Sequence, residues 1–186
     1  MKKTLLLWGI AFVLLLFAVY ITNQYSISEP EAVKASPVEV HEAASTSTPT
    51  EPSLNFMLTD LAGNQVTLDE LRGKNVFINF WATWCKWCVK EMPDMENIHQ
   101  SFNDQDLVVL AIAVGEDLED VSGYLSDKDY TFTILLDPDK SVTKVYEVKS
   151  IPTSIFIDKE GNVSYKRVGA MNEQQMLAAI ENMSGS

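Results

Sequence analysis

The stretch that decides the fold is Asn75–Cys88, with the sequence NVFINFWATWCKWC. Its first part, Asn75–Trp81, is a short apolar run rich in β-forming residues, and this predicts a buried strand. A helix is expected from about Lys86 to Phe102, because apolar side chains recur there every three residues. Cys85 and Cys88 therefore fall at a strand-to-helix junction.

The Cys-x-x-Cys spacing at such a junction favours redox chemistry. Residues i and i+3 of the first helical turn bring two sulfurs within bonding range, and the helix N-terminus stabilises a thiolate on Cys85. We expect a redox-active disulfide in which Cys85 is the exposed nucleophile and Cys88 the buried resolving thiol. One alternative is an inert bridge, which would contribute little stability by closing so small a loop. Another is half of a zinc site, for which residues 54–186 add only His99 and carboxylates.

Outward from this window, strand and helix patterns alternate over residues 54–186. Leu107–Val114 (LVVLAIAV) is a second continuous apolar run, as expected for a strand covered on both faces. This alternation predicts an α/β fold with a central mixed sheet flanked by helices, an N-terminal β-hairpin and a central helix–strand insertion. The other expected elements are hairpins at 55–67 and 154–168, helices at 117–128, 140–146 and 172–182, and a strand at 132–136.

The N-terminal part of the chain has a different composition. Thr4–Thr22 carries no charge, and 19 helical residues would span about 28 Å, close to the core of a bilayer. We expect residues 1–22 to form an uncleaved signal anchor, because the run is longer than a signal-peptide core and lacks a small-x-small cleavage site. Lys2 and Lys3 would then stay cytoplasmic, with everything after Thr22 outside the cell membrane. Residues 23–53, rich in Ser, Thr, Pro, Glu and Ala, are expected to be a flexible linker to the folded domain at 54–186.

The overall charge of the chain excludes one large class of partners. The 186 residues include 26 acidic and 14 basic side chains, for a net charge of −12. Nucleic-acid binding is not expected, since phosphate neutralisation requires a basic face. Two cysteines are also too few for a disulfide-stapled miniprotein or for a closed tetrahedral zinc site. We expect neither a cofactor nor a metal.

Several motifs together resemble the thioredoxin superfamily. The closer resemblance is to its membrane-anchored, extracytoplasmic branch, the ResA/TlpA-like thiol–disulfide oxidoreductases of cytochrome c maturation. It implies a thioredoxin-like fold over essentially the whole domain. The matching residues are Phe56–Leu71, Asn79–Cys85, Lys90–Pro93, Val114–Glu116 and Ile151–Thr153.

The resemblance also implies roles for residues beyond the cysteines. Ile151 and Pro152 match a cis-proline loop that lies against the cysteine pair and offers its backbone to a substrate strand; the alternative is a trans turn proline without a role. Glu91, three residues after Cys88, matches a glutamate near the thiols, where desolvation would raise its pKa and suit it to proton transfer. A solvated surface charge is the alternative. Asn79 stands where classical thioredoxins have a buried aspartate, so Glu91 is the best candidate for moving the proton.

The substrate surface is expected around the dithiol. Glu116 matches a second family acid that lines the substrate groove, although a helix-start carboxylate is a serious competitor. We also assign Trp84, Lys86 and Trp87 to substrate binding. The family usually has proline immediately before the second cysteine, whereas this chain has Trp87, so the redox potential cannot be carried over. Lys86 favours the thiolate form of its neighbour electrostatically.

The resemblance implies a reductase that acts on disulfides of client proteins, with apocytochrome c as the favoured client and a membrane thiol–disulfide relay protein as the electron donor. There are two alternatives within this chemistry. One is a reductant for another envelope or endospore protein, and the other is a disulfide-forming oxidase. A thiol peroxidase is less favoured, because its Pro-x-x-x-Thr-x-x-Cys motif would require other residues at Ile78 and Ala82. A Sco-type copper assembly factor is also less favoured, because that family separates its cysteines by three residues and adds a distal histidine.

Overall fold

The computed structural model describes residues 15–17, 51–102 and 107–183. The chain divides into two units, Met1–Ser45 and Thr46–Ser186, and only the second contains the cysteines. In the first unit, residues 15–17 are helical; the rest of the expected anchor over 1–22 lies outside the described residues, as do residues 23–50 of the expected linker. Over the described ranges, no helix combines the length and apolar character needed to cross a membrane.

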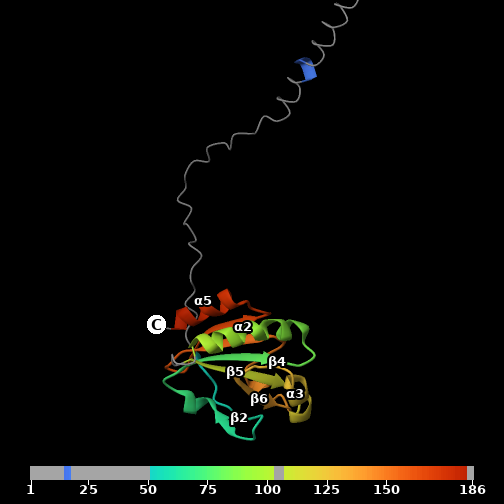
Figure 1. The fold of residues 1–186 in the computed structure, drawn as a ribbon. Coiled ribbons are helices and arrows are strands. Elements are labelled where there is room, and N and C mark those ends of the chain that lie inside the picture. Colours follow the sequence, from blue (N-terminus) through green and yellow to red (C-terminus); the bar gives the residue numbers. More distant parts are fainter. Residues whose placement is uncertain (1–14, 18–50, 103–106, 184–186) are drawn as a thin grey trace, which may run out of the picture. The chain divides into compact units, whose positions relative to one another are not determined.

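A mixed sheet forms the centre of the second unit, as the alternating pattern predicted (Figure 1). Among the described residues its strand order is β1-β8-β7-β4-β5-β6-β2-β3. β4 pairs in parallel with β5, and β5 with β6, while β7 runs antiparallel to β4. The strands are β1 (Glu51–Pro52), β2 (Met57–Asp60), β3 (Gln65–Thr67), β4 (Asn75–Trp81), β5 (Leu107–Val114), β6 (Thr133–Asp137), β7 (Thr153–Ile157) and β8 (Asn162–Val168).

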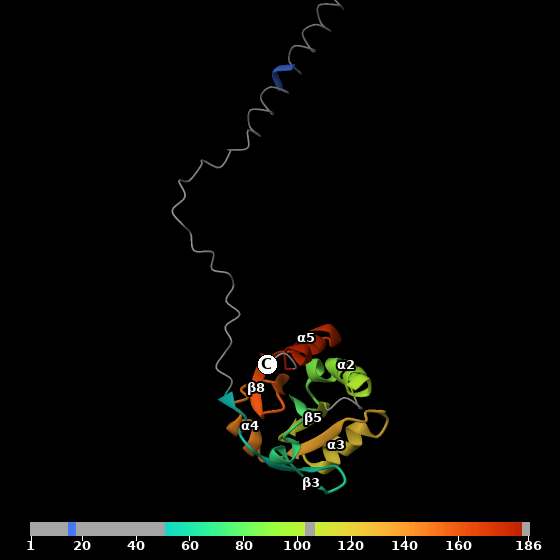
Figure 2. The ribbon, with the colours of Figure 1, turned by 90° about the vertical axis from the view of Figure 1, so that its left-hand side faces the viewer.

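Helices cover both faces of this sheet, and this explains why β4 and β5 are continuously apolar. One core layer joins the sheet to α2, α3 and α5, and the other joins it to η1 and α4. Figure 2 shows α2 and α5 next to each other, with α4 on the other side of the strands. The helices are η1 (Leu68–Leu71), α2 (Lys86–Phe102), α3 (Leu118–Leu125), α4 (Ser141–Val145) and α5 (Glu173–Met183).

The expected helix–strand insertion corresponds to α3 and β6, which lie between β5 and α4 in the chain. Of the two, β6 is a strand of the sheet. α3 begins later than predicted because Asp117 is its N-cap and accepts a hydrogen bond from the backbone N–H of Asp120. Asn172 caps the last helix, which was predicted at 172–182 and spans Glu173–Met183. Asn172 Oδ1 accepts from the N–H of Gln175 at 3.0 Å, and Gln175 Oε1 accepts from the N–H of Asn172 at 3.1 Å.

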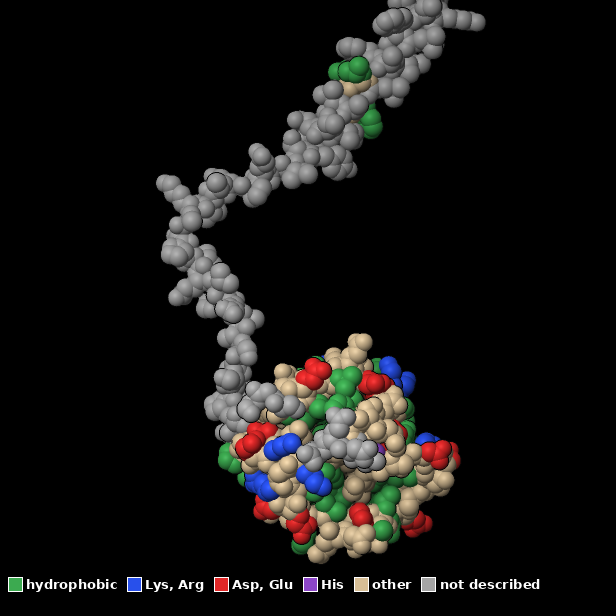
Figure 3. All heavy atoms as spheres, turned by 60° about the vertical axis from the view of Figure 1, so that its left-hand side comes forward, with side chains coloured by type: hydrophobic (Ala, Val, Ile, Leu, Met, Phe, Trp, Pro, Cys, Tyr) green, Lys and Arg blue, Asp and Glu red, His purple; other side chains and the backbone are tan. Residues whose placement is uncertain are grey.

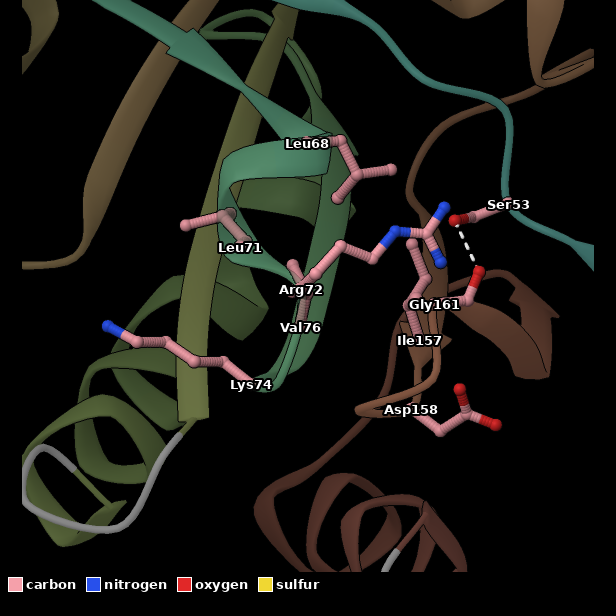
Figure 4. Close-up of a pocket in the computed structure, with 9 residues that line it drawn as sticks. All are labelled: Ser53, Leu68, Leu71, Arg72, Lys74, Val76, Ile157, Asp158 and Gly161. Carbon is pink, nitrogen blue, oxygen red and sulfur yellow. Dashed lines mark hydrogen bonds between the residues drawn. The ribbon is translucent and has the colours of Figure 1, made fainter.

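The sheet gains an edge strand that the composition did not predict. β1 lies in the segment assigned to the linker, and it pairs with the start of β8. Ser53 fixes this junction, since both its N–H and its hydroxyl donate to the carbonyl of Gly161, at 2.9 and 2.6 Å (Figure 4). Arg72 reaches towards the same turn, and its Nη1 donates to the carbonyl of Glu160 at 2.6 Å. Contacts of this kind depend on distant partners and leave no periodic signal in the sequence.

This junction lies at the end of the sheet opposite the dithiol. Val76, at the start of β4, pairs with Ile157 beside the β7–β8 turn, whereas Phe80, near the end of β4, pairs with Thr153. The dithiol follows the end of β4, so the chain enters the domain at the far end from the cysteines. Acidic side chains are scattered over the face shown in Figure 3, interleaved with basic and apolar ones.

Candidate active site

The two cysteines form a disulfide at the N-terminus of α2. The S–S distance is 2.09 Å and the Cα–Cα distance is 5.3 Å. A tight turn sets this position, because the N–H of Cys85 donates to the carbonyl of Ala82 at 3.1 Å. The N–H of Cys88 points at Cys85 Sγ from 3.3 Å, which would stabilise a thiolate there after reduction. Cys85 is largely buried as well, contrary to the exposed position predicted for it, but with 8% of its surface exposed against none for Cys88 it is the more accessible of the two.

The Ile151–Pro152 peptide bond is cis, as the resemblance implied. Pro152 is buried and Ile151 half-buried. The register of β7 with β4 places this loop at the sheet end that carries the dithiol, because Thr153 pairs with Phe80. The carbonyl of Pro152 already accepts from the N–H of Gly169 at 2.8 Å. The carbonyl of Pro152 is therefore not free to pair with another strand.

Glu91 is a buried carboxyl group, with only 2% of its surface exposed. Asn79 Nδ2 donates to Oε1 at 2.8 Å, and the backbone N–H of Met171 donates to Oε2 at 2.7 Å. Burial raises the pKa of Glu91 to about 7, and these two hydrogen bonds offset part of that rise while the negative charge of Asp94 adds to it. A carboxyl group with this pKa exchanges protons near neutrality, which is the property expected of a proton-transfer residue.

Glu116 lies at the end of β5 and is tied to the loop that precedes the dithiol. Its Oε2 accepts from the backbone N–H of Thr83 at 2.8 Å, and its Oε1 accepts from the Thr83 hydroxyl. The carboxylate is buried, so little of it is open to a substrate groove. Its observed contact is structural, since it anchors the loop two residues before Cys85.

Two exposed tryptophans flank the nucleophile. Trp84 is 72% exposed and Trp87 is 59% exposed. The ammonium group of Lys90 lies 5.3 Å from the centroid of the Trp87 ring, a cation–π arrangement, and Lys86 is exposed beside it. Large aromatic side chains left in solvent beside a reactive sulfur are typical of a surface that binds another protein.

A cleft of about 240 Å³ opens beside Glu91, between α2 and the segment that leads into α5. Because Glu91 is one of its lining residues, the cleft brings solvent close to an otherwise buried carboxyl group. Its lining residues are Trp87, Lys90, Glu91, Asp94, Ala170, Met171, Asn172 and Gln175.

The structure thus gathers the predicted residues at one end of the sheet and adds others that the sequence did not indicate. Ser154 and Met171 complete the surroundings of Glu91, and Thr83 accounts for Glu116. Asn79 was noted only as a departure from the classical aspartate, and that departure was the one available signal for its contact with Glu91. Met171 acts through its backbone, so its side chain could not have indicated this contact.

The fold is a mixed sheet covered by helices. Its site combines a dithiol at a helix N-terminus with a cis-proline loop and with a buried acid one turn further along the helix. Together these features define a thioredoxin-like thiol–disulfide oxidoreductase. Comparison with known proteins makes this more specific. Residues 49–166 match the model of the AhpC/TSA family, and the chain belongs to this family.

Relatives of this chain are named as thiol-disulfide oxidoreductases. The chain is 37% identical over 129 residues to the thiol-disulfide oxidoreductase ResA of Geobacillus kaustophilus (strain HTA426), covering 69% of this chain and 74% of the relative. It is 38% identical over 122 residues to ResA of Bacillus subtilis (strain 168), covering 66% and 68%. Among solved structures, a putative thiol:disulfide interchange protein DsbE from Chlorobium tepidum superposes with a TM-score of 0.65 at 30% identity, covering 70% of this chain and 96% of that one.

Proposed function

We propose that this oxidoreductase is a reductant that works outside the cytoplasmic membrane on disulfides of client proteins, with apocytochrome c before haem attachment as the favoured client. The observation that carries the proposal is the site itself, in which the more accessible Cys85 and a buried Cys88 lie next to a desolvated acid. The similarity to the ResA proteins supports the choice of client.

The chemistry begins with the reduced protein. The thiolate of Cys85 attacks one sulfur of the client disulfide; the client S–S bond breaks, a mixed disulfide forms and the first client thiolate leaves. Cys88 then loses its proton and attacks Cys85 Sγ, which closes the Cys85–Cys88 bond and releases the second client thiolate. The client gains two electrons and its sulfurs take up two protons, while this protein becomes oxidised.

Glu91 is suited to accept the proton that Cys88 must lose. It lies three residues after Cys88, on the same face of α2, and its pKa of about 7 leaves a substantial fraction of the carboxylate free to act as a base at neutral pH. The adjacent cleft provides the route by which the proton leaves for solvent.

The location is proposed from the N-terminal residues. The uncharged run at Thr4–Thr22 would serve as the membrane anchor, and residues 23–53 would tether the domain on the extracytoplasmic side. Entry of the chain at the sheet end opposite the cysteines would leave the dithiol free to meet clients. Disulfides persist in that compartment, so a membrane thiol–disulfide relay protein would have to reduce this dithiol again.

Trapping tests the proposal. In a Cys88→Ser variant the mixed disulfide cannot be resolved, so Cys85 should retain its client in a covalent complex that dithiothreitol releases. A Cys85→Ser, Cys88→Ser double variant is the matched control and should retain nothing. Apocytochrome c bound through its own cysteine supports the proposed client, whereas capture of other envelope proteins alone would redirect the proposal to those clients.

The redox potential separates a reductase from a disulfide-forming oxidase. We expect a value on the reducing side of about −150 mV. Equilibration with glutathione or dithiothreitol buffers, followed by thiol alkylation and mass measurement, gives this value. A potential above about −150 mV would instead identify an oxidase.

A further inference from the structure

The side-chain amide of Asn79, on β4, faces Glu91 and is only partly hydrogen-bonded: its nitrogen has partners and its oxygen does not. Asn79 is fully buried, and its Nδ2 donates to Glu91 Oε1 at 2.8 Å and to Ser154 Oγ at 3.1 Å. Its Oδ1 has no hydrogen-bond partner within the described residues. An unpaired buried acceptor is costly, so the amide is held in this orientation by the two acceptors on its other side.

This orientation matches an ionised Glu91. A carboxylate only accepts hydrogen bonds, and here each of its oxygens has one donor, from Asn79 and from the backbone of Met171. The hydroxyl of Ser154 serves as the acceptor for the second N–H of the amide.

Protonation of Glu91 makes the same orientation unfavourable. The backbone N–H of Met171 cannot turn away, and an unprotonated carboxyl oxygen is the better acceptor, so the acid proton is favoured on Oε1. The O–H of Oε1 then faces an N–H of Asn79, and two donors oppose each other. Rotation of the Asn79 amide by about 180° places Oδ1 there as the acceptor. Ser154 can follow, because a hydroxyl both accepts and donates.

We propose that Asn79 is a positioning residue whose side-chain amide turns over with the protonation state of Glu91, donating to the carboxylate and accepting from the carboxyl group, with Ser154 as its pivot. In the present orientation both amide N–H groups are paired and Oδ1 is unpaired, whereas after the turn Oδ1 would accept twice and the N–H groups would be unpaired. The inference rests on the proposed role of Glu91 as proton acceptor, and it explains how one buried site accommodates both forms. An aspartate at this position could not do so, because it would add a second buried negative charge.

Two other amide oxygens near Glu91, those of Asn172 and Gln175, already accept backbone N–H groups. The facing residues of β4 and β7 are the neutral Asn79 and Ser154, and the cleft side contributes the uncharged Ala170, Met171, Asn172 and Gln175. Among the described residues, the charged groups that line the cleft with Glu91 are Lys90 and Asp94, both on α2, and Cys88, one turn before Glu91, is in the disulfide.

Nuclear magnetic resonance of the oxidised full-length protein in mild detergent tests the inference. Asparagine and glutamate are labelled with ¹³C and ¹⁵N, and spectra are recorded from pH 5.5 to 8.5. We expect the Glu91 Cδ and Asn79 Nδ2 signals to shift with one shared midpoint near pH 7. The nuclear Overhauser contacts from the Asn79 Nδ2 protons to the side chains of Glu91 and Ser154 should be strong at pH 8.5 and lost at pH 5.5.

Two controls isolate the turnover of the amide. Asn75 is a second buried asparagine on β4 with an unpartnered Oδ1, at the other end of the strand, and its amide signals should keep their contacts across the range. In a Glu91→Gln variant the group that titrates is gone, so the pH response of Asn79 should disappear.

Two results overturn the inference. If Glu91 titrates while the Asn79 contacts persist at pH 5.5, the amide does not turn and the proposed reductase function is unaffected. If Glu91 does not titrate between pH 5.5 and 8.5, the inference fails together with the proton role of Glu91, while covalent trapping by Cys88→Ser still decides the reductase function separately.

Discussion

The difference in unfolding free energy between Glu91→Gln and wild type, measured on the oxidised proteins, should shift in favour of the variant as the pH rises. The pKa of Glu91 increases from 4.5 to about 7 on folding, chiefly through burial, and at about 1.4 kcal/mol per pH unit this amounts to about 3 kcal/mol. Because the folded pKa lies above the unfolded one, the folded state binds more protons between these values. The stability that the protonated acid contributes is complete below pH 4.5 and is lost as the pH rises through 7.

Urea unfolding of both proteins with the disulfide intact measures this effect. Between pH 5 and 8.5 the wild type should lose about 2–3 kcal/mol of unfolding free energy relative to Glu91→Gln. The variant also changes the hydrogen bonds to Asn79 and Met171, but that cost is the same at both pH values and cancels in the comparison.

Glu96→Gln on the same helix is the matched control. Burial acts to raise the pKa of Glu96, but hydrogen bonds from Gln100 and Thr131 outweigh it, and the pKa is lowered. Its contribution to stability is therefore complete above about pH 4.5 and should stay constant between pH 5 and 8.5. A difference between wild type and Glu91→Gln that stays flat over this range, or an equal change in Glu96→Gln, would show that the pKa of Glu91 is not raised by folding.

Two further substitutions test the loop anchor and the junction at the far end of the sheet. Thr83→Val removes the hydroxyl bond to Glu116 and should lower the unfolding free energy by about 1–2 kcal/mol in urea, whereas Thr83→Ser should retain most of it. Gly161→Ala should destabilise the protein more than Gly63→Ala. Both glycines have positive φ, so both variants strain the backbone. Of the two, only Gly161 has a neighbour in the way of the new Cβ, namely Arg72 Nη1 at 1.5 Å. Equal losses of thermal stability in these two alanine variants would contradict the packing shown in Figure 4.

The parts of the fold that could be predicted are those whose signal is local. The apolar runs that became β4 and β5 need cover on both faces, and the cap at Asn172 begins α5 through its own side chain. β1 could not be predicted, because it is short, contains proline and depends on β8 for every backbone partner. Its position is determined by distant contacts such as those of Ser53 with Gly161.

The same distinction applies to the site. Cys85 and Cys88 were predictable because four consecutive residues place both sulfurs on one helical turn. The pKa of Glu91 depends partly on Met171, eighty residues later, whose contribution is a backbone N–H that any residue except proline supplies. A sequence can therefore indicate a reactive residue. It does not indicate the groups that shift the pKa of that residue when these groups act through the backbone.

The redox state of the dithiol must also affect Glu91. The pKa of about 7 belongs to the oxidised protein, in which neither sulfur carries a charge. Reduction allows a thiolate to form on Cys85, stabilised by the N–H of Cys88 at the start of the same helix. Like charges in a desolvated site disfavour each other, so a thiolate on Cys85 and an ionised Glu91 oppose each other. In the mixed disulfide Cys85 carries no charge, so an ionised Glu91 is least opposed at the step in which, under the proposed function, it accepts the proton of Cys88.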